Sequence, residues 1–372
     1  MALNKYRLGD LLELLEHTNQ NLRYSADDVR GVNNLKQLMT TKADLNDRDL
    51  RKFQIVNPGE FVFNHRTSRN GEKFSIAYND LGKTVICTED YVVFRVKPES
   101  EKILNAYWLY MYFNRPEFDR YVITNSWGSS TEFYNWEDLC SIELKLPDFA
   151  TQQQFVNIYK AMVANQQSYE RGLEDLKLLL DSTIEDLRRK NHAVKSKQFV
   201  LGDLICQRRE KYDGSAIPIR GVSKEGFVEP RQADADLHLY NQYYYNDFVF
   251  NPARMELNSI ALNIFYEKAC CSSLYEVFYV SRPDIILPEY LNLLLKRSEF
   301  ARWCEYVGWG SAREYCRVDT ISEYPIVVPS LKEQETVVEL SRAYNLRKGI
   351  NERLKEQIRD ICPIMIRGSL EE

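Results

Sequence analysis

The chain repeats itself, and this duplication constrains its fold more than any other feature of the sequence. Leu8–Asp10 returns as Leu201–Asp203, and Phe61–Asn64 returns as Phe248–Asn251. Further landmarks recur in the same order, and those of the last third keep one constant spacing. One such match is expected by chance, but an ordered series is not. The sequence therefore predicts two copies of one domain.

Each copy mixes short strands with short helices in no regular strand–helix–strand order, which predicts an α+β fold. A chain of 372 residues also exceeds what one core usually supports. We predict a first domain over 1–150, a spacer helix over 151–196, a second domain over 197–330 and a second spacer helix over 331–372.

A heptad seam predicts a long helix from about Thr151 to Lys195. Apolar residues recur at alternating steps of four and three along it, with only Gln166 and Thr183 off the pattern. A second seam, from Val337 to Met365, follows the second copy in the same register. An amphipathic helix lying on a globular core is the alternative for either seam alone. The repeat favours two helices that pair as an antiparallel coiled coil, with the two domains related by a pseudo-two-fold axis.

Polar side chains gather in loops directly after buried strands, where binding contacts are usually carried. His65–Gly71 follows the strand at Phe61–Asn64, and Asn251–Ser259 follows its copy. The scaffolds repeat but the loop contents differ, which indicates two similar frames that read two different targets. A solvated turn without a ligand is the alternative interpretation of each loop.

Trp127–Thr131 and Trp309–Arg313 form a second candidate pair of loops. We expect the tryptophans in the core and the hydroxyl and arginine side chains near phosphates or base edges. The predicted DNA-binding residues are Arg30, Arg66, Thr67, Ser68, Arg69, Asn70, Ser129, Ser130, Thr131, Arg220, Arg254, Asn258, Ser259, Ser311 and Arg313.

Motifs for catalysis are missing from the sequence. It holds no glycine-rich phosphate loop and no nucleophile elbow, and its four histidines lie far apart without carboxylates at ligand spacing. Glu143 and Lys145 resemble the end of a nuclease core, but an alternating edge strand explains them better. No catalytic residue and no metal site is therefore predicted, and the chain is interpreted as a binding and assembly subunit.

Charge and composition restrict the partners. The net charge is −5 and acidic residues outnumber basic ones in both copies, so a nucleic-acid surface would have to be a local patch. Eight scattered cysteines without a C-x-x-C pair suit reduced thiols. With neither a long apolar stretch nor a signal-peptide pattern, we expect a cytoplasmic protein that does not enter a membrane.

Together these features resemble the specificity subunit of a type I restriction-modification system. The resemblance covers the whole chain and includes the Leu-Gly-Asp openings, the strands ending at Asn64 and Asn251, and a Pro-x-x-x-Glu-Gln step into each helix. That step is intact at Pro329–Gln334. At Pro147–Gln152, threonine replaces the glutamate, a change that would weaken the start of the first helix.

The resemblance implies that this chain binds double-stranded DNA at a bipartite site and does no chemistry itself. It also implies partners: two modification (methyltransferase) subunits and restriction (ATPase and endonuclease) subunits. S-adenosylmethionine, ATP and Mg are then expected on those partners, and no cofactor on this chain.

Two other classes of function remain open at this stage. One is a coiled-coil scaffold whose two domains bind proteins and no DNA, which the acidic balance favours. The other is a self-contained nuclease or methyltransferase. Salt-dependent binding of duplex DNA distinguishes the first, and activity of the isolated chain would reveal the second.

Overall fold

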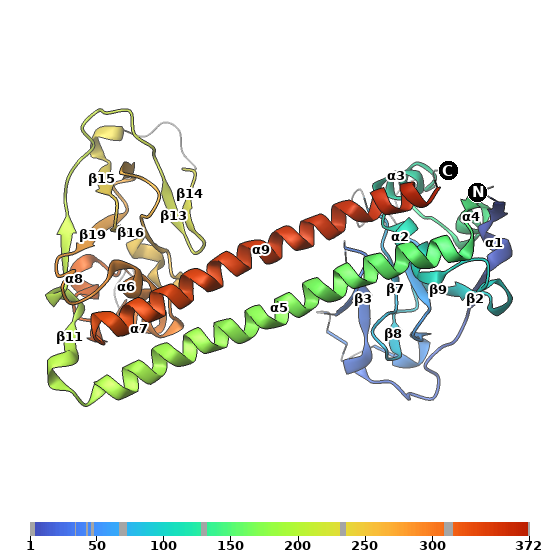
Figure 1. The fold of residues 1–372 in the computed structure, drawn as a ribbon, viewed down its shortest axis with the longest axis horizontal. Coiled ribbons are helices and arrows are strands. Elements are labelled where there is room, and N and C mark those ends of the chain that lie inside the picture. The colour runs from blue at the N-terminus through green and yellow to red at the C-terminus, as the bar shows by residue number, and fades with distance from the viewer. Residues whose placement is uncertain are drawn as a thin grey trace. The chain divides into compact units, whose positions relative to one another are not determined.

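The computed structural model describes residues 4–33, 35–41, 44–45, 48–66, 73–127, 132–230, 236–308 and 315–370. The chain divides into two compact units, Met1–Glu170 with Ile350–Glu372 (unit 1) and Arg171–Gly349 (unit 2). The division passes through both long helices, α5 (Phe149–His192) and α9 (Leu331–Leu370). Each unit therefore contains a part of each helix (Figure 1).

Unit 1 is built on a four-stranded antiparallel sheet with the strand order β2-β9-β6-β7. In the described part of this unit, three two-stranded ladders and four short helices accompany the sheet. The sheet strands are β2 (Leu12–Leu15), β9 (Tyr91–Val96), β6 (Phe61–Asn64) and β7 (Ile76–Tyr78). The ladders pair β1 (Asn4–Arg7) with β10 (Glu143–Leu146), β3 (Arg30–Val32) with β4 (Leu38–Thr40), and β5 (Gln54–Val56) with β8 (Val85–Cys87). The helices are α1 (Leu8–Leu11), α2 (Ala106–Phe113), α3 (Pro116–Thr124) and α4 (Trp136–Ser141).

Unit 2 repeats this topology strand for strand, with the sheet order β12-β19-β16-β17. Its sheet strands are β12 (Ile205–Arg208), β19 (Glu276–Val280), β16 (Asp247–Phe250) and β17 (Ile260–Leu262). The ladders pair β11 (Gln198–Val200) with β20 (Pro325–Val327), β13 (Gly221–Ser223) with β14 (Gly226–Val228), and β15 (Asn241–Tyr244) with β18 (Lys268–Cys271). The helices are α6 (Pro288–Leu295), α7 (Ser298–Gly308) and α8 (Val318–Ile321). The predicted α+β class is confirmed.

One of the two inner strands of each sheet, β6 in unit 1 and β16 in unit 2, is buried on both faces. Phe61 packs on the helical side of unit 1 and stacks on Phe94 at 4.9 Å between ring centroids, while Val62 points to a second core beneath the β5–β8 ladder. In unit 2, Phe248 stacks in the same way on Phe278 at 4.7 Å. Alternating side chains of one strand thus enter two cores, which explains why Phe-Val-Phe is apolar at every position.

The two long helices pack against each other, as the paired seams predict. In unit 1, Gln166 of α5 donates a hydrogen bond to Asn351 of α9 at 3.0 Å, and the ring of Phe155 lies beside Gly368. Earlier residues of α5 meet later residues of α9, so the pairing is antiparallel. Gln166 departs from the apolar pattern because it forms this buried polar pair. Thr183 departs from it because the neighbouring Ile184 is the buried residue at that turn of α5.

A buried glutamine ties each helix to its unit. The side-chain amide of Gln152 donates to the carbonyls of Ile103 and Pro147 at 2.8 and 2.9 Å and accepts from the Asn105 N–H at 2.8 Å. Gln334 forms the same three bonds at the same distances, with Ile285, Pro329 and Leu287. Both side chains are fully buried, so each glutamine satisfies three backbone groups that water cannot reach.

The start of the first helix is capped despite its threonine. The Asp148 carboxylate accepts hydrogen bonds from the Thr151 N–H and hydroxyl at 2.8 and 3.1 Å. At the second helix, Glu333 instead accepts from the N–H and hydroxyl of Ser330. A carboxylate therefore caps the start of both helices, from the residue before α5 in the first case and from inside α9 in the second. The weaker start expected for the first helix stays a prediction.

The glycine of each Leu-Gly-Asp opening is required by close packing. A Cβ on Gly9 would lie 2.9 Å from the Cys140 Cβ, and one on Gly202 would lie 3.0 Å from the Ser322 Cβ. All eight cysteines are free thiols. In the part of the chain that the structure describes, no helix is long and apolar enough to span a bilayer.

Candidate nucleic-acid interface

In each unit, the chain just after the inner strand β6 or β16 lies next to residues that follow the tryptophan loop in sequence. In unit 1, the Tyr134 N–H donates to the carbonyl of His65 at 2.9 Å, which joins the chain after β6 to the chain after the Trp127 loop. In unit 2, the Cys316 N–H donates to the carbonyl of Pro252, again at 2.9 Å. Two segments far apart in the sequence therefore meet at one edge of each sheet, in the same way in both copies.

A groove of about 600 Å³ lies beside this edge in unit 2. It runs between the β13–β14 hairpin and the turn Pro252–Leu257 that follows β16. Three of the predicted DNA-binding residues line it, namely Arg220, Arg254 and Ser259. Other polar side chains that line it include Lys224, Tyr275 and Tyr315, together with the acidic Glu225 and Glu229.

Arg220 is held in place by several partners. Its guanidinium donates to the Tyr266 hydroxyl at 2.9 Å and to the carbonyl of Ile219 at 2.8 Å, and it pairs with Glu229 at 3.0 Å. The hydrogen bond with Tyr266, ahead of the nearby charges, raises the pKa of Arg220 above its ordinary value. This arginine is thus pre-oriented at the groove with its charge partly neutralised.

Arg254 differs, because its side chain is exposed and forms no ion pair with the described residues. The preceding turn fixes its backbone, since the Asn251 side chain accepts from the Ala253 N–H at 3.1 Å. Asn258, beside the groove, has a left-handed backbone (φ 56°) and donates to the carbonyl of Lys296. Its side-chain oxygen is buried without a partner in the described ranges. Ser259 is only 3% exposed and lies on the groove floor.

In unit 1 the corresponding arginines are already paired. Arg30, on β3, donates to the carbonyls of Asp27 and Val29 at 2.7 and 2.8 Å. Arg66 pairs with Asp90 at 3.1 Å, and its backbone bridges to Phe133. The remaining predicted residues lie outside the described residues, namely Thr67, Ser68, Arg69, Asn70, Ser129, Ser130, Thr131, Ser311 and Arg313.

Trp127 is 72% exposed, so the expectation that it belongs to the core is wrong. Its backbone pairs with Phe133 by two hydrogen bonds, of 3.0 and 2.9 Å, and this short ladder turns the indole outward. An exposed tryptophan next to a candidate loop is a candidate contact residue, a role that nothing in the sequence signalled. The sequence did not predict three other residues of the groove, because only the folded chain brings them together: Lys224, Tyr275 and Tyr315.

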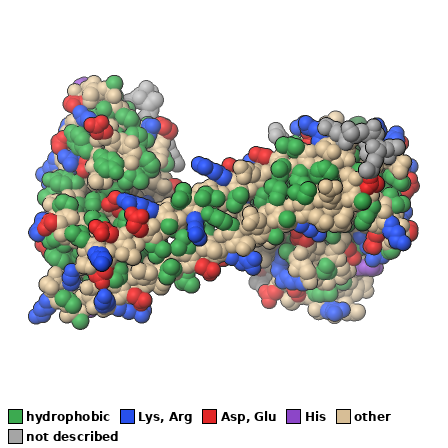
Figure 2. All heavy atoms as spheres, in the orientation of Figure 1, with side chains coloured by type: hydrophobic (Ala, Val, Ile, Leu, Met, Phe, Trp, Pro, Cys, Tyr) green, Lys and Arg blue, Asp and Glu red, His purple; other side chains and the backbone are tan. Residues whose placement is uncertain are grey.

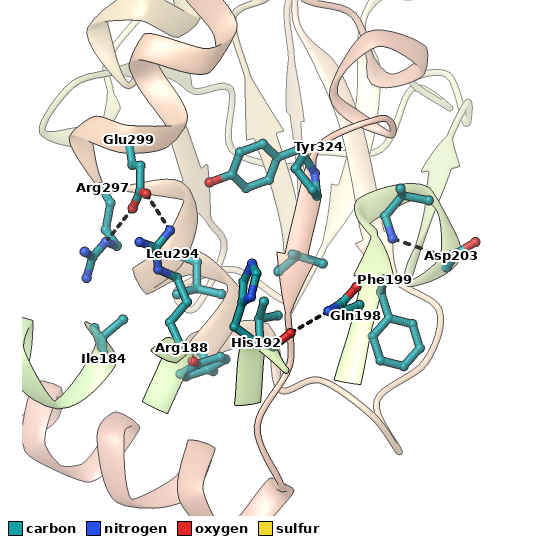
Figure 3. Close-up of a pocket in the computed structure, with 15 residues that line it drawn as sticks. Ile184, Arg188, His192, Gln198, Phe199, Asp203, Leu294, Arg297, Glu299 and Tyr324 are labelled. Atoms are coloured by element: carbon teal, nitrogen blue, oxygen red, sulfur yellow. Dashed lines mark hydrogen bonds and ion pairs between the residues drawn. The ribbon is translucent and has the colours of Figure 1, made fainter. Parts of the chain in front are cut away.

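A second cavity, of about 550 Å³, lies where α5 ends in unit 2 (Figure 3). Arg188 and Arg297 point into this region, yet both are paired with carboxylates. Arg188 contacts Glu299 at 2.7 Å, and Arg297 contacts Glu185 at 3.4 Å and Glu299 at 3.7 Å. Because these ion pairs join α5 to α7, we interpret them as packing contacts of the helix and not as an anion site.

Charges of both signs are interspersed over the face of each unit seen in Figure 2, which agrees with a local rather than a general basic surface. Glu143, which resembled part of a nuclease core, forms an ion pair with Lys5 across the β1–β10 ladder. Among the described residues, no group of three or more His, Cys, Asp or Glu side chains is arranged to hold a metal ion.

The sequence matches no protein-family model and no curated protein. The structure, however, matches the crystal structure of a type I restriction-modification system S subunit from M. genitalium, with a TM-score of 0.60 and 13% sequence identity. The match covers 98% of this chain and 96% of that one. The chain has the fold of a type I S subunit.

Two further solved structures match over nearly the full length. The HsdS subunit from Thermoanaerobacter tengcongensis gives a TM-score of 0.44 at 13% identity and covers 99% of this chain and 96% of that one. A chain from a study of complex assembly and conformational transition of the type I R-M system gives a TM-score of 0.44 at 14% identity. That match covers 99% of this chain and 98% of that one. The match with the M. genitalium S subunit confirms the resemblance inferred from the sequence at the level of the fold.

Proposed function

We propose that this chain is the DNA-recognition subunit of a type I restriction-modification complex. The observation that carries the proposal is the likeness to an S subunit over 98% of the chain. In this proposal each unit reads one half of a bipartite site, and the chain itself catalyses nothing.

Two features of the structure support this assignment. The units share one topology, but the side chains that follow β6 and β16 differ, as two readers of different half-sites require. The groove of unit 2 places Arg220, Arg254 and Lys224 around one concave surface. Arginine suits such a surface because its fork of donors matches guanine edges and phosphates.

The proposal includes the partners that complete such a complex. Two modification subunits would supply adenine methylation with S-adenosylmethionine, and restriction subunits would supply ATP- and Mg-dependent translocation and cleavage. This chain would hold none of these cofactors. Its contribution would be to bind the DNA site and to assemble the partner subunits.

Methylome sequencing of cells with and without this gene tests the proposal. We expect one bipartite methylated motif to be lost with the gene and to return on complementation. Purified complex should then bind a duplex that carries the motif and release it as salt is raised, because neutralised phosphates release counterions on binding. An unchanged methylome, together with no motif-dependent binding, would contradict the assignment.

A protein-binding scaffold is the second candidate, and one observation favours it. Leu257 and Leu274 line the groove of unit 2 although they are 53% and 75% exposed. Exposed apolar side chains beside a groove are typical of protein interfaces. Binding that is insensitive to salt and to DNA sequence would support the scaffold, since apolar contacts do not depend on counterion release.

A further inference from the structure

In unit 1, a buried lysine fastens the β3–β4 hairpin to the helical side of the unit. Lys36 lies in the turn of that hairpin and is only 3% exposed. Its ammonium forms an ion pair with Asp119 of α3 at 2.7 Å and donates to the carbonyl of Phe113, the last residue of α2. Its backbone is left-handed (φ 60°), and its carbonyl accepts from the Tyr110 hydroxyl at 3.1 Å.

In unit 2, a lysine makes the same connection from the opposite side. Lys296 directly follows α6, and its ammonium donates to the carbonyl of Lys224 in the β13–β14 turn at 3.2 Å. It also donates to the carbonyl of Asn258 at 3.2 Å. Burial lowers the pKa of this ammonium from its ordinary value, while Glu225 opposes the shift.

The two lysines therefore join equivalent elements but come from different ones. In unit 1 the hairpin supplies the ammonium and the end of α2 accepts it. In unit 2 the residue after α6 supplies the ammonium and the hairpin accepts it. The same tie thus exists twice without sharing a single aligned residue, which is expected where the connection matters and the particular side chain does not.

Each tied hairpin carries one of the predicted contact arginines. Arg30 is the first residue of β3, and Arg220 directly precedes β13. Each hairpin has only three residues in either strand and forms a two-stranded sheet of its own. A hairpin this short is unstable by itself in water, so its position depends on what it docks against.

We propose that Lys36 and Lys296 are positioning residues for DNA recognition, each holding the hairpin of its own unit in the orientation that presents Arg30 or Arg220 to DNA. The inference rests on the proposed function and adds to it the residues that set the geometry of each reading surface. Lys36 cannot itself reach DNA, because its ammonium is enclosed by Asp119 and the Phe113 carbonyl.

The test uses the full complex and duplexes that carry the motif from methylome comparison, with either half-site scrambled in turn. Lys36→Met is combined with Asp119→Asn so that no unpaired charge is left buried, since a lone buried charge would threaten folding. The Asp119→Asn change keeps a side-chain oxygen for the Phe74 N–H, from which the Asp119 carboxylate accepts at 3.0 Å. Lys296→Met is the variant for unit 2, where the side chain is only partly buried.

We expect each variant to bind about tenfold more weakly through the half-site read by its own unit and normally through the other. The salt dependence should be unchanged, because neither ammonium contacts a phosphate. Hydrogen exchange should accelerate over 30–40 in the unit 1 variant and over 221–228 in the Lys296→Met variant.

Lys224→Met is the matched control. The Lys224 side chain lines the groove, but Lys296 donates to the Lys224 backbone carbonyl. This variant therefore keeps the hydrogen bond from Lys296 to the hairpin and removes only a side-chain charge. Loss of a phosphate contact would lower the slope of log K against log salt by about 0.9. Hairpin exchange in this control should match that of the wild type.

The outcomes distinguish the positioning role from the proposed function. Wild-type affinity of both variants for both half-sites overturns the positioning role, as does equal loss at both half-sites. A reduced salt slope in Lys296→Met shows direct phosphate contact and overturns it for that residue. If the wild-type complex binds no bipartite duplex, the proposed function itself fails and the positioning role fails with it.

Discussion

Units 1 and 2 share a frame but differ at the surface where each is expected to meet DNA. The frame agrees down to single hydrogen bonds, since Gln152 and Gln334 bind three equivalent backbone groups each. Asn79 and Asn263 form another such pair, both fully buried and both donating to two carbonyls. At the surface proposed to bind DNA, by contrast, Arg66 is paired with Asp90, while Arg254 forms no ion pair among the described residues.

Comparing the two units indicates which parts of a duplicated fold can change freely. A buried amide that satisfies three backbone groups has no substitute of the same shape, so it recurs in both copies. An exposed arginine loses little when its partner changes, because water replaces the lost contact. The hairpin ties lie between these extremes, since both units keep the connection while the lysine changes sides.

The strongest test of the shared frame removes the glutamines. Gln152→Leu should lower the free energy of unfolding of unit 1 by about 3 to 4 kcal/mol, because two carbonyls and one N–H are left buried without partners. Gln334→Leu should cost unit 2 the same amount. Hydrogen exchange of unit-specific peptides in denaturant measures both. Gln154→Leu, at an exposed neighbouring position, should change stability by only about 0.5 kcal/mol. Markedly unequal costs in the two units would contradict the equivalence of the two frames.

The glycines of the two openings provide a second test of the frame. Gly9→Ala and Gly202→Ala should each destabilise their unit by about 1 to 3 kcal/mol, because the new methyl group would overlap Cys140 or Ser322. Gly172→Ala is the control, since a methyl group added to that helical glycine would meet no atom within 4 Å among the described residues. It should instead stabilise α5 by roughly 0.5 to 1 kcal/mol. Thermal unfolding, followed by hydrogen exchange of peptides from each unit, measures both the expected destabilisation and the expected stabilisation.

The arginines sharpen the contrast between the reading surfaces. Arg254→Ala should weaken binding through one half-site by about 1 to 3 kcal/mol if it reads a base. Arg66→Ala should weaken the other half-site less, because Arg66 must first leave Asp90 to reach DNA. Binding to duplexes with single scrambled half-sites measures each effect, and Arg359→Ala on α9 serves as control. Equal losses at both half-sites from either variant would contradict separate reading surfaces.

The smallest expected effect concerns the caps of the two long helices. The Ser330 hydroxyl and N–H, with Lys190, hold the pKa of Glu333 at about 2, below its ordinary 4.5. Because the folded-state pKa is depressed, the cap stabilises fully above pH 4.5 and is lost as the pH falls toward 2. The difference in denaturation midpoint between wild type and Glu333→Gln should therefore shrink over this window. A difference that stays constant with pH would show that the carboxylate does not act as a cap.

Much of the fold was predictable from the sequence because it depends on periodic burial. The two seams predicted paired helices, and the Phe-Val-Phe strands and their repeat predicted two similar α+β domains. Polar residues inside these patterns were not predictable in the same way, since Gln166 departs from the seam only because Asn351 lies opposite.

The candidate site was predictable in part. Arg220, Arg254 and Ser259 were identified from loop chemistry, and the structure places them around one groove. Trp127 was assigned to the core because tryptophan is usually buried, but a two-bond ladder with Phe133 turns it outward. Nothing in the local sequence signals that ladder, because its partner comes from beyond the loop.

The duplication, the two paired long helices, the α+β class and the side chains proposed to bind DNA could all be predicted from the sequence alone. These properties depend on periodicity and on residue chemistry, which are written along the chain. Tertiary structure alone decided which polar groups meet. The hydrogen bond from Tyr134 to His65, the shared role of Gln152 and Gln334, and the opposed lysines Lys36 and Lys296 all join residues distant in sequence. Such contacts arise because every buried donor and acceptor must find a partner, and only the folded chain determines which one is within reach.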